Sequence, residues 1–335
     1  MKEIISREIQ LKNRPAGIPS ASDFEIEKVP VRKPKDGEIL VQNEYISVDP
    51  YMRGRMYDRE SYTPAFQIGE TIPGGSIGKV IQSNSDQYVV GDYVLNFSGW
   101  REYFLSTGVG LTKIDPSIAP VQAFLGAFGM PGLTAYVGLL NIGKPKENET
   151  VYVSAASGAV GSIVCQIAKI KGCRVIGSAG SDQKVDWLLN TIGIDGAFNY
   201  KKVDNLTTEL HQQCPDGIDI YFENVGGEHL EAVLANMNPF GRIPVCGMIS
   251  QYNNAKPQPG PKNLTNIIGK RLLLQGFIVS DHNDQRAQFQ SDMAKWLRED
   301  KLQWEETIIE GIENTPEAFI GLFSGENIGK MLVRV

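Results

Sequence analysis

The chain has 335 residues, of which 41% are hydrophobic and 21% charged, and its formal net charge is −6. This composition is typical of a globular protein, and at roughly 150 residues per domain the length predicts about two domains. The acidic balance argues against a protein built mainly to bind nucleic acid. No run of about 18 apolar residues occurs and the N-terminus lacks a signal-peptide core, so we expect no membrane partner and a cytoplasmic location.

Residues 1 to about 125 predict a β-rich domain. Short runs such as 38–45 alternate apolar and polar residues, and Pro and Gly separate them, as at 72–75. This pattern is typical of a compact antiparallel barrel or sandwich. The closing run 330–335 also reads as a strand, and we expect it to return to this first domain. The predicted first domain is therefore 1–125 together with 300–335.

The middle of the chain, residues 126–299, predicts a second domain of the α/β class. A helix is expected at 159–171, with apolar residues on one face. The expected strands are 151–155, 174–178, 197–200, 218–224, 242–246 and 272–279. Alternating strands and helices indicate a parallel sheet covered on both faces.

A glycine-rich turn joins the first of these strands to the helix. Residues 156–161 fit the pattern G-x-G-x-x-G with Ala in the first place. Gly158 would let the backbone approach a pyrophosphate, and Gly161 would allow close helix–strand packing. Ala159 and Val160 lie between them, where the N–H groups of the helix N-terminus would face the phosphates. The turn therefore predicts dinucleotide binding, and the alternative is a plain glycine-rich turn.

The end of the next strand predicts which dinucleotide binds. NAD-binding proteins carry Asp or Glu about 20 residues further on, but this position is Ser178, and residues 177–180 include no acid. Ser181 and Lys184 follow and can supply donors to a 2′-phosphate, although Lys184 can also be a solvated surface lysine. Asp182 is the contrary feature, and we expect it to be an N-cap whose carboxylate faces the helix amides. NADPH is the predicted cofactor.

The cysteines and histidines argue against a metal site. They are Cys165, Cys173, Cys214, Cys246, His211, His229 and His282. None lies in the first 150 residues, and no CxxC pair occurs. Zinc sites are built mostly from these residue types at short spacing, so we expect no metal. Each cysteine is expected to be a small buried hydrophobic residue.

Eight segments, taken in order, carry a family resemblance. They are 48–53, 129–136, 155–162, 179–184, 198–201, 222–227, 246–253 and 325–330. On these segments the chain resembles the zinc-independent medium-chain dehydrogenases/reductases, in the branch of prostaglandin reductase, NADPH-dependent 2-alkenal reductase and curcumin reductase. The resemblance covers nearly the whole length. It implies a Rossmann doubly wound parallel sheet inserted in a GroES-like β-rich domain, with NADPH in the cleft between the two, and a homodimer.

The resemblance also implies a reaction and a set of site residues. The family adds hydride to the β-carbon of an α,β-unsaturated aldehyde or ketone, so it acts on the CH–CH group. Matching cofactor positions are Lys184 and Tyr200 near the adenosine phosphate, Asn224 and Tyr252 near the nicotinamide half, Asn327 on the nicotinamide side, and the framing backbone of Cys246, Gly247, Ser250, Phe277, Ile278 and Val279. Tyr51 matches a substrate-pocket tyrosine. Residues 97–101 depart from a more aromatic family stretch, which leaves the substrate open.

The reaction itself places few demands on side chains. The cofactor carries the hydride, but the developing enolate oxygen needs hydrogen-bond donors. Tyr252 comes just after a strand, at the edge where ligands bind in open α/β sheets, and Tyr51 would approach from the β-rich domain. Both are candidate catalytic residues, with water as a third proton source. For each tyrosine the alternative is packing with an exposed hydroxyl.

Three other functions fit the sequence to different degrees. Zinc-free relatives reduce quinones, so an NADPH:quinone reductase is the nearest rival. A low-turnover NADPH-binding sensor or structural protein, like some lens crystallins, belongs to a different class. An alcohol dehydrogenase is disfavoured because the zinc ligands are missing.

Overall fold

Residues 4–256 and 258–335 are described by the computed structural model, which divides into two compact units. Unit 1 combines the residues up to Gly126 with Glu306–Val335, and unit 2 is the continuous stretch Ala127–Glu305. Residues 300–305 thus group with unit 2, whereas the sequence assigned them to the first domain. Unit 1 is therefore built from both ends of the chain.

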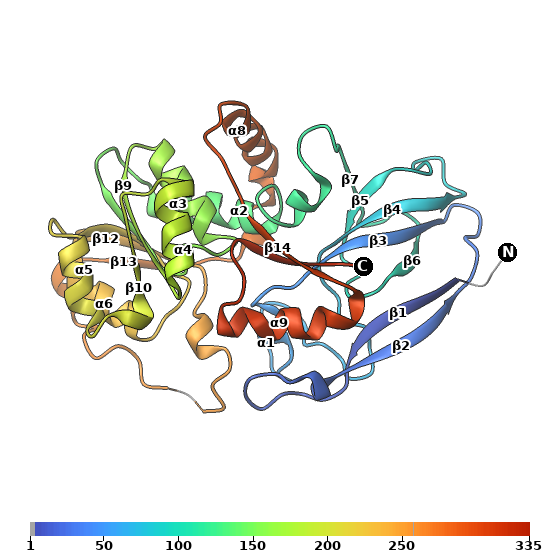
Figure 1. Cartoon of the computed structure of the whole chain (residues 1–335), viewed down its shortest axis with the longest axis horizontal. Coiled ribbons are helices and arrows are strands. Elements are labelled where there is room, and N and C mark those ends of the chain that lie inside the picture. Colours follow the sequence, from blue (N-terminus) through green and yellow to red (C-terminus); the bar gives the residue numbers. More distant parts are fainter. Residues whose placement is uncertain (1–3, 257) are drawn as a thin grey trace. The chain divides into compact units, whose positions relative to one another are not determined.

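Unit 1 is the β-rich unit. Its elements are β1 (Ile4–Leu11), β2 (Phe24–Val31), β3 (Ile39–Ser47), α1 (Met52–Arg55), β4 (Ser76–Ser83), β5 (Tyr93–Asn96), β6 (Tyr103–Ser106), β7 (Thr112–Ile114), β14 (Glu306–Glu310), α9 (Thr315–Ser324) and β15 (Lys330–Arg334). Strands β1 and β2 pair by themselves, and the larger sheet has the order β14-β15-β3-β4-β5-β7, with β6 also on β3. Pairing is antiparallel except between β14 and β15, which are parallel. The red C-terminal strands and α9 thus lie among the blue N-terminal elements in Figure 1.

An aromatic cluster forms part of the core of unit 1. Trp100 is fully buried, with its ring centroid 5.9 Å from that of Phe24 and 5.8 Å from that of Phe319. Its indole Nε1 donates to the carbonyl of Ser47 at 3.3 Å. Within the divergent stretch 97–101, Trp100 is therefore a core residue, whereas Phe97 is exposed.

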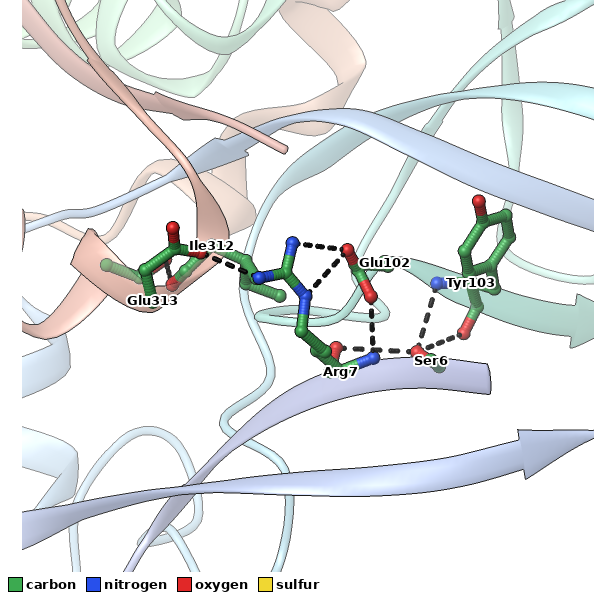
Figure 2. A network of polar contacts seen from close by, with 7 residues as sticks. Ser6, Arg7, Glu102, Tyr103, Ile312 and Glu313 are labelled. Atoms are coloured by element: carbon green, nitrogen blue, oxygen red, sulfur yellow. Dashed lines mark hydrogen bonds and ion pairs between the residues drawn. The ribbon is translucent and has the colours of Figure 1, made fainter. Parts of the chain in front are cut away.

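An ion-pair network links distant segments of the same unit (Figure 2). The Arg7 guanidinium donates to Glu102 Oε1 from Nε and Nη2, at 2.9 and 2.7 Å, and to Glu313 Oε2 from Nη1 at 2.8 Å. Beside it, Ser6 Oγ accepts the backbone N–H of Tyr103 at 3.1 Å. Strand β1 is thereby joined to β6 and to the turn at Ile312–Asn314.

Unit 2 is an α/β unit with a parallel sheet. Its elements are α2 (Met130–Val137), β8 (Thr150–Val153), α3 (Gly161–Ile170), β9 (Arg174–Ala179), α4 (Asp182–Trp187), β10 (Gly196–Asn199), α5 (Leu206–Gln213), β11 (Ile218–Phe222), α6 (Glu228–Asn236), β12 (Met237–Val245), α7 (Asn266–Lys270), β13 (Leu273–Gly276) and α8 (Arg286–Arg298). The strand order is β10-β9-β8-β11-β12-β13, and every pair is parallel. This is the order of a doubly wound dinucleotide-binding sheet, with its switch point between β8 and β11.

The expected elements of unit 2 are all present, with different ends. The strand predicted at 151–155 stops at Val153, because Ala155 has a left-handed φ of 48°. The strand predicted at 242–246 begins earlier in the structure, at Met237. The sequence pattern missed its first residues because Pro239 and Gly241 are typical of turns. The strand predicted at 272–279 spans only Leu273–Gly276.

Candidate functional site

The switch point brings together the segments that follow β8 and β11. Asn224 donates from Nδ2 to the carbonyl of Ser154 at 2.8 Å, and its own N–H donates to Ser154 Oγ at 3.0 Å. The ends of the two central strands are thus tied to each other. In a doubly wound sheet, ligands bind outside the carboxyl ends of the strands at this point. Asn224 and the glycine turn, both predicted site residues, therefore lie at this switch point.

The glycine turn is shaped by close backbone contacts. A methyl carbon on Gly161 would lie 2.4 Å from the carbonyl oxygen of Ala155, a distance at which something must move. On Gly158 it would lie 3.2 Å from the same oxygen. Ala156 stands in the place of the first glycine of the pattern. A methyl carbon on Gly177 of β9 would lie 2.7 Å from the Ala156 Cβ, so the glycine at 177 leaves space for the alanine at 156. The turn and its neighbouring strand therefore fit a pyrophosphate-binding loop.

The start of α4 corrects one prediction. Ser181 is the N-cap, and its Oγ accepts the N–H of Lys184 at 3.4 Å. Asp182 is not the N-cap but the first helical residue, and its carboxylate is bound by Asn199 Nδ2 at 2.9 Å and by Lys202 Nζ. The acid that argued against NADPH is thus paired with a neighbouring lysine.

Two lysines and a tyrosine gather beside the end of β9. A methyl carbon on Gly180 would lie 3.2 Å from the Tyr200 hydroxyl and 3.3 Å from Lys201 Cε. Burial and the Lys201 ammonium lower the pKa of Lys184, so an anion between these lysines would relieve their repulsion. Lys201 was not among the predicted residues, although its place directly after Tyr200 could have indicated it. The donors and the missing carboxylate fit a ribose 2′-phosphate.

A turn after β12 completes this edge of the sheet. The N–H groups of Cys246 and Gly247 donate to the carbonyl of Glu223, at 3.0 and 3.1 Å. Ser250 Oγ donates to the carbonyl of Val225 at 2.6 Å. This hydrogen bond ties the turn after β12 to the segment after β11.

Tyr252 ends this turn. Its hydroxyl accepts the N–H of Met248 at 3.3 Å and lies over the backbone at Gly247.

Burial, followed by the nearby Glu223, raises the pKa of the Cys246 thiol to about 12, so the thiol stays protonated near neutral pH. Cys246 is only partly buried, whereas the other three cysteines are buried as expected.

The segment after β13 contains the other predicted framing residues. Phe277, Ile278 and Val279 are each partly buried and follow the carboxyl end of that strand. A methyl carbon on Gly138 would lie 2.7 Å from the Phe277 ring, so the ring packs against the backbone at that glycine.

The remaining two predicted residues belong to unit 1. Tyr51 precedes α1, and burial, followed by the Asp49 carboxylate, raises the pKa of its phenol. Asp49 lies 3.2 Å from the buried Lys330 Nζ. Because its pKa is raised, the Tyr51 phenol keeps its proton, as a hydrogen-bond donor must.

Asn327 donates from Nδ2 to the carbonyl of Gly329 at 2.7 Å, within the loop before β15.

Two kinds of feature are missing from the described chain. Residues 4–256 and 258–335 contain no group of three or more His, Cys, Asp or Glu side chains placed to hold a metal ion. Within the same residues, none of the helices combines the length and apolar character required to span a bilayer.

The doubly wound sheet and its glycine turn are typical of the dinucleotide-binding class of proteins. Family models described as the N-terminal domain of oxidoreductase and as zinc-binding dehydrogenase match residues 7–114 and 159–299. The NADPH-dependent curcumin reductase of Escherichia coli (strain K12) is 44% identical, covering 97% of this chain and 95% of its own. The 2-alkenal reductase (NADP(+)-dependent) of Nicotiana tabacum is 45% identical, covering 100% and 98%.

A solved structure agrees with these matches. The crystal structure of CurA in complex with NADPH from Vibrio vulnificus superposes with a TM-score of 0.93 at 44% identity, covering 98% of this chain and 99% of that one. The chain belongs to the medium-chain dehydrogenase/reductase family, in the branch that contains the curcumin, 2-alkenal and prostaglandin reductases.

Proposed function

We propose that this protein is an NADPH-dependent reductase that saturates the C=C bond of α,β-unsaturated aldehydes and ketones. The observation that carries the proposal is the end of β9, where Lys184 and Lys201 gather and Asp182 is paired elsewhere. This arrangement favours a 2′-phosphorylated dinucleotide. The substrate class is supported by the named activities of relatives that match nearly the whole chain.

The residues of unit 2 would hold the cofactor in parts. The turn from Gly158 to Gly161 would present backbone N–H groups to the pyrophosphate, while Ser181 and Tyr200 would join the lysines at the 2′-phosphate. Asn224, whose Nδ2 is already bonded to Ser154, would offer its amide oxygen toward the nicotinamide half. When bound, NADPH supplies the hydride.

Each of the two tyrosines is a candidate hydrogen-bond donor to the substrate oxygen. The Tyr252 hydroxyl accepts a hydrogen bond from Met248, which polarises it as a donor toward a developing enolate. Tyr51 has a raised pKa and therefore acts as a donor rather than a base. Either tyrosine, or water, would then protonate the α-carbon.

The experiment compares substrate classes directly. The purified protein is mixed with NADPH and a panel of enals, enones and quinones, and the products are identified by mass spectrometry and NMR. We expect the carbonyl to be retained and the C=C bond saturated. Turnover of quinones alone would identify the protein as a quinone reductase, and NADPH binding without turnover of any substrate would favour the sensor.

We also propose that the chain forms a homodimer. Strand β13 is the last strand of the parallel sheet, and Leu273 on it is about half exposed. Phe240 and Ile268, on the neighbouring β12 and α7, are largely exposed as well. An edge strand beside apolar side chains suits pairing with a second copy. Light scattering should give the dimer mass, and Ile268→Glu should shift it toward the monomer.

A further inference from the structure

The side chain of Glu223 is a buried acid that the proposed reaction does not use. It follows β11 at the switch point, directly before Asn224, and it is fully buried. A buried carboxyl group is costly unless hydrogen bonds offset its desolvation. Its partners therefore indicate why this position carries an acid.

One oxygen of this carboxyl group receives four donors. Glu223 Oε1 accepts the Tyr221 hydroxyl at 2.6 Å and the backbone N–H groups of Val225 and Gly226, each at 2.7 Å. The Ser154 hydroxyl makes a longer fourth hydrogen bond to it at 3.5 Å. The two amides belong to the segment that continues from Asn224 toward α6. The acid therefore bends this segment back over its own side chain and holds it there.

The second oxygen, Oε2, is buried and has no hydrogen-bond partner among the described residues. Burial is also the main cause of a raised pKa for this carboxyl group. Only the acceptor Oε1 is used, so a neutral side chain of the same shape would provide the same contacts. Glutamine meets that condition, and leucine does not.

The backbone of the same residue joins the second loop of the site. The Glu223 carbonyl accepts the N–H groups of Cys246 and Gly247, and the Val225 carbonyl accepts Ser250 Oγ. We propose that Glu223 is a positioning residue that holds the segments of Asn224 and of Cys246–Ser250 in the arrangement that receives the nicotinamide half of the cofactor. This inference rests on the proposed placement of the cofactor and not on the choice of substrate.

The test separates the two halves of the cofactor. NADPH binding is followed by fluorescence, and 2′,5′-ADP, which represents only the adenosine half, is titrated by calorimetry. In Glu223→Leu we expect the Kd for NADPH to rise about tenfold, since the backbone amides of Val225 and Gly226 lose their acceptor. The Kd for 2′,5′-ADP should stay within about twofold, because Lys184 and Tyr200 are untouched.

Two further variants sharpen the result. Glu223→Gln keeps the acceptor and should bind NADPH within about threefold of wild type. Asp219→Leu is the matched control, since Asp219 lies on the same strand and accepts the N–H of Thr150 at 2.8 Å away from the site. It should lower the Tm and leave both ligand affinities unchanged.

The inference would be overturned if Glu223→Leu weakened the binding of NADPH and 2′,5′-ADP equally, or left NADPH binding unchanged. It would also be overturned if Glu223→Gln raised the Kd for NADPH as much as Glu223→Leu does. If Glu223→Leu does not fold, Tyr221→Phe takes its place, with weaker NADPH binding and unchanged 2′,5′-ADP binding expected; no change in NADPH binding would overturn it. No substrate is used in these measurements, so failure to reduce enones would refute the proposed function alone.

Discussion

Replacing either glycine of the turn after β8 with alanine should impair the protein, but in different ways: Gly161→Ala should lower its stability and Gly158→Ala its affinity for NADPH. In Gly161→Ala the new methyl carbon would lie 2.4 Å from the carbonyl oxygen of Ala155 and 2.9 Å from Ala156 Cα. Both neighbours are backbone atoms, so the turn and the start of α3 must separate. Overpacking of this kind costs about 1–3 kcal/mol, and the gain in helix propensity offsets about 1 kcal/mol at most. We therefore expect the Tm to fall by several degrees.

In Gly158→Ala the methyl carbon would lie 3.2 Å from the same oxygen, which small movements can accommodate. Its stability should be close to that of wild type, but the methyl group would occupy the space through which a pyrophosphate approaches. Thermal unfolding without ligand and NADPH titration, run on both variants, separate the effects. A stable Gly158→Ala that binds NADPH normally would refute the role of this turn, and an unchanged Tm in Gly161→Ala would refute the packing argument.

Four further predictions concern the cofactor, the reaction, the pH and metal. Lys184→Ala and Lys201→Ala should each weaken NADPH binding by about 1–2 kcal/mol and leave NADH binding nearly unchanged; equal losses in titrations of both cofactors would contradict the 2′-phosphate site. Tyr252→Phe should lower kcat for an enone by about 10² or less with little change in NADPH affinity, and an unchanged kcat/KM would remove its catalytic role. Burial lowers the pKa of His229 from 6.5 to about 4, so on acidification the unfolded state binds the proton before the folded state does. The free energy of unfolding therefore falls by up to about 3 kcal/mol as the pH drops from 6.5 to 4. Denaturant unfolding of His229→Phe should show a smaller loss than wild type, whereas a substitution of the exposed His211 should not. Dialysis against a strong chelator should leave activity and Tm unchanged, and zinc lost together with activity would contradict this.

Local patterns predicted most of unit 2, because its strands and helices follow their own hydrophobic periods. The glycine turn was identified for the same reason, since a strand precedes it and an amphipathic helix follows it. Element ends were less accurate where backbone conformation decides them, as at Ala155 with its positive φ. The first half of β12 was missed because Pro239 is typical of a turn and not of a strand interior.

The details of the site depended on contacts between distant residues. Ser181 and Asp182 are both good N-cap types, and the choice between them is settled by Asn199 and Lys202, which lie 17 and 20 residues after Asp182. No local pattern predicts such a pairing. The cluster that includes Lys201 forms in the same way, because β10 lies beside β9 only in the folded sheet.

The split construction of unit 1 has a consequence for the order of folding during synthesis. Strand β15 lies between β14 and β3, and Arg7 on the first strand pairs with Glu313 near the end of the chain. Unit 2 is complete once Glu305 has left the ribosome, but the sheet of unit 1 must wait for residues 306–335. The usual sequence, in which the N-terminal domain folds first, therefore does not hold for unit 1. Until β15 is available, only the Tyr45–Ser47 end of β3 lacks its partner, because Ile39–Gln42 already pairs with β6.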